Sequence, residues 1–333
     1  MKKFFALVLA LVMALSLVAC GSAPTDGGEG NAPAATKMRF VTGGESGTYY
    51  AFGGTIAQHA TNNAGIEVIG IVGSGSQANI EQLQANTAEL AFCQSDVMAY
   101  AYAGTNLFAE TGAVDCFSTV AALYMEQVQV VTCDPSIKTV ADLAGKRVSI
   151  GAAGSGVYFN AIDVLGCYGL TEADIIPTYQ GFGDSANSLK DGQIDAAFVV
   201  SGAPTTAIVE LATTKDAYLV AIEDENVEKL LAASPYYAKN VIPAGTYNGQ
   251  TEDVTTVAVG AVLLARNDMP EDAIYALTAD IFNNAADLVT THAKYGEIDM
   301  AYGASITSVP YHPGAAKGRF RFFSLGKTLR SRL

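Results

Sequence analysis

Short apolar segments alternate with longer amphipathic stretches along most of this chain, and no other feature constrains its fold as strongly. In the first third, the pattern predicts strands over 38–42, 66–72 and 90–93 and helices over 48–62, 77–86 and 95–103. Strands that alternate with helices are typical of a largely parallel sheet with helices on its faces. The sequence therefore predicts an α/β fold with a doubly wound sheet.

A second strand–helix series follows the first. Its strands are expected over 127–133, 147–151, 196–200, 218–222 and 255–265, and its helices over 140–143, 157–168, 186–190, 205–211 and 271–292. Two α/β units that are joined by two long strands enclose a cleft, and ligands of open α/β sheets bind at the carboxyl ends of the strands. The two expected domains are 37–125 with about 268–316, and about 126–267.

Charge and composition exclude several classes of protein. Half of the 333 residues are hydrophobic, which is too many for a disordered chain. No apolar run of about 18 residues occurs after the N-terminus, which excludes a polytopic membrane protein. Acidic residues outnumber basic ones by 33 to 19, a net charge of −14, and such a surface repels nucleic acid. The composition fits a soluble protein outside the cytoplasm.

The N-terminus has the pattern of a bacterial export signal. Two lysines precede an apolar stretch over 4–18 that is shorter than a membrane span. The sequence Leu-Val-Ala-Cys at 17–20 resembles a lipobox, whose cysteine becomes the lipid-modified first residue of the mature chain. We expect a signal peptide over 1–19, a lipid on Cys20 and a flexible tether over 20–36. An ordinary signal peptide with a chance cysteine is the alternative.

The tail over 317–333 differs in composition from the rest of the chain. It holds six of the 19 basic residues and no acidic residue. A disordered tail or an altered reading frame in the source sequence would explain this composition. A basic amphipathic segment that contacts anionic lipid or a permease is the other interpretation.

Four further cysteines lie in the body of the chain, and none belongs to a CxxC pair. Their apolar surroundings are typical of small buried core residues. Export also permits a disulfide, but the spacing does not give its connectivity, so pairing stays open. The four are Cys93, Cys116, Cys133 and Cys167.

Three glycine-rich turns each lie between a predicted strand and a predicted helix, at 43–50, 73–79 and 151–156. Glycine lets the backbone approach a ligand closely, and free amides at a helix start attract anions. Three such turns could together hold carboxylate groups without an arginine. For any one of them, a tight turn with a capping hydroxyl is the simpler interpretation.

Catalytic and cofactor motifs are nearly absent. The second turn satisfies the dinucleotide pattern G-x-G-x-x-A through Gly73, Gly75 and Ala78, but this pattern alone is weak. The chain has no G-x-S-x-G and no H-E-x-x-H motif, and its three histidines are not at metal-ligand spacing. We predict no catalytic residue, no metal site, no cofactor and no enzyme activity. A carboxylate pair that uses Asp184 or Asp195 stays open.

Several short motifs occur in a fixed order from Arg39 to Lys317. They are 43–50, 53–54, Gly75-Ser76 with Asn79, Ala91 to Asp96, Asp142 to Val148, 154–156, Asp191 to Phe198 and Pro310 to Ala315. With this ordered set the chain resembles the solute-binding subunits of TRAP transporters of the TAXI type. The resemblance ends after Lys317, where such chains usually continue in a short Tyr-rich, acid-containing helix.

The resemblance implies a two-domain periplasmic-binding-protein-like fold of type II, with the ligand cleft between the domains. It implies a lipid-anchored receptor outside the cytoplasm that closes on a small carboxylate of the glutamate, glutamine or 2-oxoglutarate class. The receptor would deliver this ligand to the membrane subunits of a TRAP permease. The ligand-binding residues that it implies are Ser46, Gly47, Thr48, Tyr49, Ser74, Ser76, Asn79, Gln94, Ser95, Tyr124, Ser155 and Gly156.

Two other classes of function stay open beside the receptor. A secreted hydrolase on a two-lobed α/β fold needs a nucleophile next to a base, and the sequence contains no motif for such a pair. A lipoprotein sensor or adhesin module needs no small-molecule cleft. The sequence does not name the ligand, the coupling ion or the oligomeric state.

Overall fold

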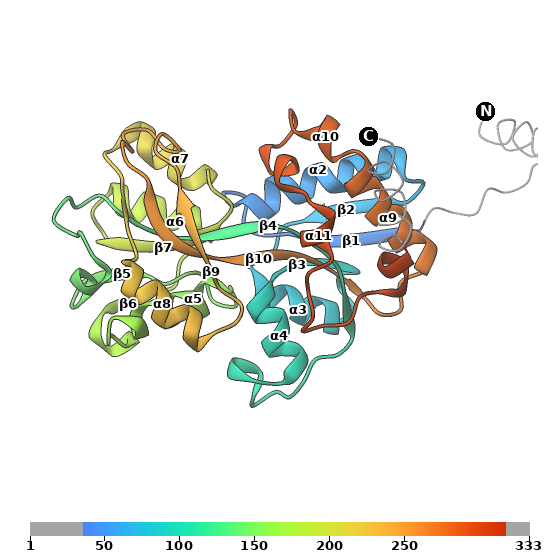
Figure 1. Cartoon of the computed structure of the whole chain (residues 1–333), viewed down its shortest axis with the longest axis horizontal. Coiled ribbons are helices and arrows are strands. Elements are labelled where there is room, and N and C mark those ends of the chain that lie inside the picture. Colours follow the sequence, from blue (N-terminus) through green and yellow to red (C-terminus); the bar gives the residue numbers. More distant parts are fainter. Residues whose placement is uncertain (1–35, 318–333) are drawn as a thin grey trace, which may run out of the picture. The chain divides into compact units, whose positions relative to one another are not determined.

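The structure of the protein is a computed structural model, and it describes residues 36–317. In this range the chain forms strands and helices in alternation, as Figure 1 shows. The strands are β1 (Lys37–Val41), β2 (Glu67–Ile71), β3 (Leu90–Gln94), β4 (Phe117–Thr132), β5 (Arg147–Ser149), β6 (Ile176–Thr178), β7 (Ala196–Ser201), β8 (Tyr218–Val220), β9 (Ala238–Ile242) and β10 (Val254–Arg266).

The helices lie between these strands and after the last of them. The α-helices are α2 (Thr48–Asn63), α3 (Ser76–Gln84), α4 (Ser95–Ala103), α5 (Val157–Cys167), α6 (Phe182–Lys190), α7 (Thr206–Thr214), α8 (Asp224–Ala233), α9 (Glu271–Asn283), α10 (Ala285–Leu288) and α11 (Met300–Gly303). The short 3-10 helices are η1 (Asn106–Phe108), η2 (Val140–Leu143), η3 (Glu172–Asp174) and η4 (Ala293–Glu297).

Two long antiparallel strands, β4 and β10, form the middle of a single sheet of order β2-β1-β3-β10-β4-β7-β5-β6. β10 pairs with β9 through 254–258 and with β3 through 261–265. β4 pairs with β10 through 117–127 and with β7 through 127–132. Both strands therefore run from one half of the molecule into the other (Figure 1). We call β1–β3, α2–α4 and α9–α11 the first lobe, and β5–β9 with α5–α8 the second lobe.

Each lobe contains three parallel strands beside the central pair. They are β2, β1 and β3 in the first lobe and β6, β5 and β7 in the second. A helix follows each of these six strands in the chain. Because parallel strands joined by helices have their carboxyl ends at one edge, each lobe presents one edge of loops and helix starts.

Phe92 lies in the core of the first lobe and fixes the start of α2 against the sheet. Its ring stacks on that of Tyr49, with 4.6 Å between centroids, and packs against Phe40 at 4.9 Å. α2 itself lies very close to the sheet, since a Cβ atom at Gly53 would be 2.5 Å from Thr42 Cγ2. The loop before α2 is therefore held by a rigid base.

Most predicted elements form, but several details differ. The strand predicted over 127–133 is β4, which begins at Phe117, because this apolar run is buried on both faces and shows no alternation. The helix predicted over 271–292 ends at Asn283, where the backbone of Asn284 turns out of the helical region with ψ of 3°. The sequence pattern also missed β6, α8 and β9. The expected domain boundary near 126 falls inside β4.

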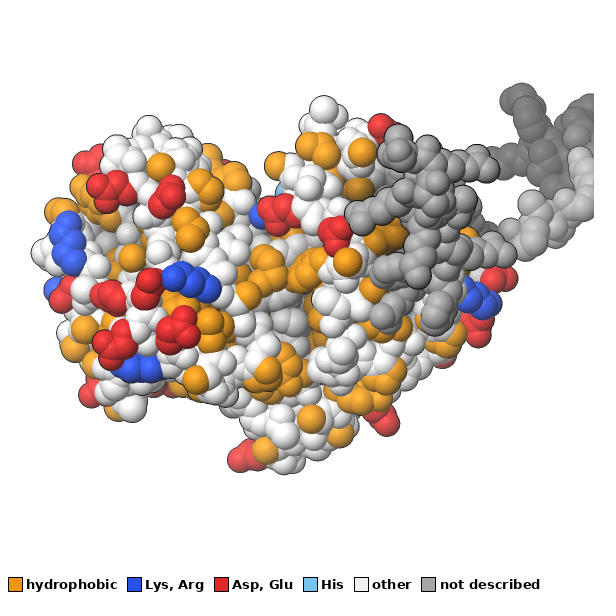
Figure 2. Space-filling view, in the orientation of Figure 1, with side chains coloured by type: hydrophobic (Ala, Val, Ile, Leu, Met, Phe, Trp, Pro, Cys, Tyr) orange, Lys and Arg blue, Asp and Glu red, His pale blue; other side chains and the backbone are white. Residues whose placement is uncertain are grey.

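The signal peptide over 1–19, the lipidation site Cys20 and the tail over 318–333 lie outside the described residues. Within 36–317, no helix combines the length and the apolar character that a membrane crossing requires. On the face shown in Figure 2, acidic and basic side chains are interspersed over the second lobe.

Replacing Phe92 by alanine tests whether this aromatic packing holds the first lobe together. We expect Phe92→Ala to lower the free energy of unfolding by about 3–5 kcal/mol, since it leaves a cavity in a closed core. Urea unfolding followed by circular dichroism measures the change. Val72→Ala is the control, because Val72 is 54% exposed and should change stability by less than about 0.5 kcal/mol. Equal losses of unfolding free energy in the two variants would contradict the assignment of Phe92 to the core that holds the first lobe together.

Candidate ligand-binding site

A cavity of about 430 Å³ lies between the two lobes, at the carboxyl ends of their parallel strands. Its walls come from the loop before each of α2, α3, α5 and α6, together with the ends of β3 and β7 and the middle of β4. Both lobes therefore contribute to one cavity. The lining residues are 43–49, 73–76, Gln94, Glu126, Ala152, 155–157, 181–184, Val200 and Ser201.

Four helices begin with a glycine at the cavity. The N-cap residues of α2, α3, α5 and α6 are Gly47, Gly75, Gly156 and Gly181, and none of these residues supplies a side-chain cap. At the start of α2, Thr48 N donates instead to Ser201 Oγ of the second lobe at 3.2 Å. The first amides of a helix lack partners within the helix, and its N-terminus carries about half a positive charge. The four helix starts thus give the cavity a positive character that does not depend on a basic side chain.

Gly75 is required by its conformation and by the contact between the lobes. Its φ of +117° is unfavourable for other residues, and a Cβ atom there would lie 2.9 Å from Ser155 Cα in the second lobe. Beside it, Ala78 N donates to Gly154 O at 2.9 Å. The second and third glycine turns therefore touch each other across the cavity.

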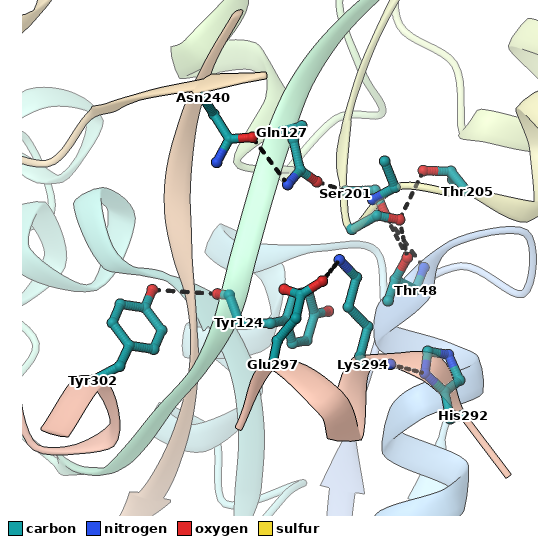
Figure 3. Close-up of polar contacts among 12 residues, drawn as sticks. Thr48, Tyr124, Gln127, Ser201, Thr205, Asn240, His292, Lys294, Glu297 and Tyr302 are labelled. Atoms are coloured by element: carbon teal, nitrogen blue, oxygen red, sulfur yellow. Dashed lines mark hydrogen bonds and ion pairs between the residues drawn. The ribbon is translucent and has the colours of Figure 1, made fainter. Parts of the chain in front are cut away.

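Further hydrogen bonds join the lobes on the other side of the cavity. Thr48 Oγ1 donates to Gly202 O at 2.8 Å, and Ser201 Oγ donates to Thr48 Oγ1 at 3.0 Å. Figure 3 shows Thr48 on α2 pointing toward Ser201 at the end of β7. With contacts on both sides, the structure has the closed arrangement of its two lobes.

Glu126 is a buried acid in the cavity wall. Only 2% of its surface is exposed, and Tyr49 Oη donates to its Oε2 at 2.8 Å. Burial raises the pKa of Glu126 to about 8, while the hydrogen bond from Tyr49 acts in the opposite direction. The negative charge of Asp96 also raises this pKa, and Lys294 lowers it.

A buried polar network extends from Gln94 in the cavity wall to both lobes. Gln94 Nε2 donates to Asn160 Oδ1 at 2.9 Å, and Asn160 Nδ2 donates to Asp96 Oδ2 at 2.9 Å. Asn160 lies on α5 of the second lobe, whereas Asp96 lies on α4 of the first. Burial raises the pKa of Asp96 to about 6. The network joins the lobes only when they are closed.

The structure brings most of the predicted binding residues to this cavity. Two of them, Gln94 and Ser155, have a buried oxygen, Oε1 and Oγ, without a hydrogen-bond partner among residues 36–317. Polar atoms of this kind are normally satisfied, so a ligand or water is expected there. The predicted residues that line the cavity are Ser46, Gly47, Thr48, Tyr49, Ser74, Ser76, Gln94, Ser155 and Gly156.

Three predicted residues do not line the cavity. Asn79 is fully buried, and its Nδ2 donates to the carbonyl oxygens of Thr42 and Phe92 within the first lobe. Ser95 Oγ accepts from Gly260 N at 2.9 Å. Tyr124 packs edge-on against Phe52 behind the cavity wall. These three residues support the wall from behind.

Sequence reasoning missed several lining residues. Glu126 is the only acid in the apolar run of β4, and a lone acid in a buried strand could have drawn attention to it. Ser201 follows a predicted strand without a motif. Gly181 is the N-cap of α6, and Gly183 lies in its first turn. The start of this helix was predicted at 186, so its role as a fourth glycine turn was not recognised.

The cavity has acidic but no basic side chains. Among its lining residues are Glu45, Glu126 and Asp184, and no Lys, Arg or His. Within 36–317, no cluster of three or more His, Cys, Asp or Glu side chains has the arrangement of a metal site. Asp184 and Asp195 form no hydrogen bond with each other, and Asp195 pairs instead with Arg147.

The four cysteines of the body carry free thiols. Cys93 is buried in the core, which raises the pKa of its thiol, and the other three are partly exposed. The disulfide that the sequence left open is therefore not formed among the described residues.

The chain has a two-lobed α/β fold like that of periplasmic binding proteins, and the predicted fold class is confirmed. A structure described as a periplasmic transporter matches with a TM-score of 0.53 at 15% identity, over 90% of this chain and 98% of its own. A protein from Bordetella bronchiseptica RB50 matches with a TM-score of 0.51 at 17% identity, over 85% and 88%. The alkanesulfonate-binding protein of Xanthomonas axonopodis pv. citri matches with a TM-score of 0.47 at 16% identity, over 90% and 95%.

The chain belongs to the NMT1-like family, which it matches over residues 40–318. The prediction that the chain is not an enzyme agrees with this family assignment. The TAXI type that the sequence resembles is a finer assignment, and it stays a prediction.

Substitution of Gly75 tests the contact between the glycine turns. In Gly75→Ala the new Cβ atom would meet Ser155, so we expect a larger radius of gyration by small-angle X-ray scattering, with fewer molecules closed. Gly54→Ala on α2 is the control. No atom lies within 4 Å of a Cβ at Gly54, so this change should raise stability by about 0.5–1 kcal/mol and leave the radius unchanged. Equal radii for the wild type and Gly75→Ala would contradict the role of this contact.

The raised pKa of Glu126 predicts a pH-dependent cost in stability. Between the ordinary pKa of 4.5 and the folded value of about 8, the folded state binds more protons than the unfolded state. The free energy of unfolding therefore falls as pH rises through this window. Glu126→Gln lacks this linkage and keeps an acceptor for the Tyr49 hydroxyl. We expect the ligand-free variant to gain about 1–3 kcal/mol over the wild type above about pH 8, and much less near about pH 5.

Urea unfolding of both proteins at several pH values measures this difference. Asp96 titrates in both proteins, so its contribution largely cancels. Glu110→Gln is the control, because Glu110 is an exposed acid. A stability difference between the Glu126 variant and the wild type that stayed constant with pH would show that Glu126 is ionised in the folded state at all these pH values.

Proposed function

We propose that the protein is an extracytoplasmic solute-binding receptor that captures a small carboxylate of the glutamate, glutamine or 2-oxoglutarate class. The observation that carries this proposal is the cavity between two lobes, with four helix starts around it whose N-cap residues are glycines. Helix N-termini hold carboxylates through backbone amides and their dipoles. The volume of about 430 Å³ suits one small ligand with a few waters.

The lobes open and close about β4 and β10, which are the two strands that they share. Ligand contacts to the turns of both lobes favour the closed state, because only that state offers all of the contacts at once. Ser74 and Ser76 from the first lobe and Ser155 from the second are the hydroxyl groups that we assign to the ligand. We also assign the side-chain amide oxygen of Gln94, which lines the same cavity, to the ligand.

The receptor works with a membrane permease, which we propose to be of the TRAP type with a TAXI-type receptor. The ordered motifs of the sequence support this assignment. The signal pattern before Cys20 supports a lipid anchor in the bacterial cell membrane, and the tether over 20–36 then leaves the lobes in water. A ligand captured in the cleft would be released where the lobes meet the permease.

No observation in the structure favours the hydrolase alternative. The cavity has serines but no histidine in its wall, and Ser155 Oγ has no base beside it. A sensor or adhesin module needs no small-molecule cleft, so the cavity between the lobes does not favour that alternative either.

Ligand binding to Ser155→Ala tests the proposed function. Isothermal titration of the purified protein, freed of bound ligand by unfolding and refolding, should show binding of glutamate, glutamine, 2-oxoglutarate or succinate and none of a branched neutral amino acid. Ser155→Ala should weaken that binding about 10- to 100-fold, since it removes a hydroxyl that bonds a charged group. Ser308→Ala, at an exposed serine in the first lobe, should bind like the wild type.

The proposal has two ways to fail in this experiment. Binding of none of the four carboxylates by a well-folded protein would exclude the ligand class. Equal affinities of the wild type and Ser155→Ala would exclude the assigned site while leaving the receptor in place.

A further inference from the structure

The carboxylate of Glu126 lines the cavity, and only one of its two oxygens accepts a hydrogen bond from residues 36–317. Tyr49 Oη donates to Oε2, and no hydrogen bond to Oε1 is found among residues 36–317. The side chain comes from β4, one of the two strands that cross between the lobes, so its position depends on the rigid sheet and not on a loop. A ligand in the cavity therefore meets a fixed, buried acid.

Among residues 36–317, no basic side chain forms an ion pair with this acid. Lys294 acts on Glu126 through its charge, but its Nζ forms an ion pair with Glu297 and lies over the Tyr124 ring, 5.4 Å from the centroid. Figure 3 shows this lysine reaching toward Glu297 beside Tyr124. Lys294 does not line the cavity. A buried carboxylate without an ion-pair partner is costly, and a cationic group on the ligand would remove that cost.

The cavity thus offers two opposite kinds of partner. The starts of α2, α3, α5 and α6 attract a carboxylate, and Glu126 attracts a cation. A ligand that carries both a carboxylate and an ammonium group satisfies both kinds of partner. A dicarboxylate without an amine leaves Glu126 facing a second negative charge. Building on the proposed function, we infer that the ligand is an amino acid, and that Glu126 selects its ammonium group against keto acids of the same skeleton.

This selection has a consequence for protons. Burial holds the ligand-free Glu126 largely protonated at neutral pH, because its pKa is about 8. An ammonium group favours the ionised carboxylate, so the carboxyl proton leaves to solvent when the amino acid binds. A keto acid would favour the protonated carboxyl instead, and its binding would take up protons.

Other titratable groups face Glu126 from the elements around it. Burial raises the pKa of each tyrosine and of the cysteine among them, so these stay neutral near pH 7. Burial also raises the pKa of Asp96, to about 6, which lies below the neutral pH at which Glu126 is expected to change its protonation on ligand binding. The groups are Tyr49 on α2, Cys93 on β3, Asp96 on α4, Tyr124 on β4, Lys294 on η4 and Tyr302 on α11.

The decisive experiment compares pairs of ligands that differ only in the amine. Titration calorimetry of the ligand-free protein with L-glutamate and with 2-oxoglutarate should give about 10- to 100-fold tighter binding of glutamate. Glu126→Gln should lose most of this preference and bind the two ligands within about threefold. Glu110→Gln, which removes the same charge from an exposed position, should keep the wild-type preference.

A second readout uses proton release. Titrations at pH 7 in two buffers of different ionisation enthalpy should show protons released when the wild type binds glutamate, and none when Glu126→Gln binds it. Circular dichroism melting checks that Glu126→Gln is folded. We expect it to be folded, because the substitution should stabilise the ligand-free protein.

The outcomes separate the inference from the proposed function. Equal or tighter binding of 2-oxoglutarate by the wild type, or proton uptake with glutamate, would overturn the role of Glu126 and leave the carboxylate receptor intact. An unchanged preference in Glu126→Gln would also overturn it. If neither glutamate, glutamine, 2-oxoglutarate nor succinate binds, the proposed ligand class fails and the inference fails with it.

Discussion

The passage of β4 and β10 through both lobes is the constraint on which the rest of this structure depends. Because the two strands pair with each other over most of their length, the lobes share one sheet and have no independent linkers. The parallel strands on either side then end at facing edges, and the helices that follow them begin there. The cavity is therefore a result of topology, and its lining is set by whichever residues start those helices.

Glycine at four of these helix starts serves two physical requirements at once. At Gly75 a side chain would collide with Ser155, so the lobes could not approach. The same absence of side chains leaves the first amides of α2, α3, α5 and α6 without local caps. A protein with this arrangement can attract an anion without burying an arginine in the cleft, where a cation would need its own counter-charge in the open state.

The sequence predicted what depends on local pattern and missed what depends on tertiary packing. α4 has its predicted bounds, and the three recognised glycine turns lie at the cavity, because strand–glycine–helix junctions have a clear local pattern. The first half of β4 was missed, since a strand buried on both faces resembles any apolar run. Glu126 lies in that missed segment. Asn79 and Tyr124 look like site residues in sequence, but only packing shows that they face away from the cavity.

Glu126 also connects ligand choice to lobe closure. In the closed structure its carboxyl group is buried without an ion-pair partner. Such burial is costly at neutral pH, so contacts such as those of Thr48 with Ser201 and Gly202 act against an electrostatic cost. An ammonium group placed on Glu126 removes part of that cost in the closed state alone. Since a ligand shifts an equilibrium only by its differential affinity for the two states, the group that distinguishes the ligand is also the group that favours closure.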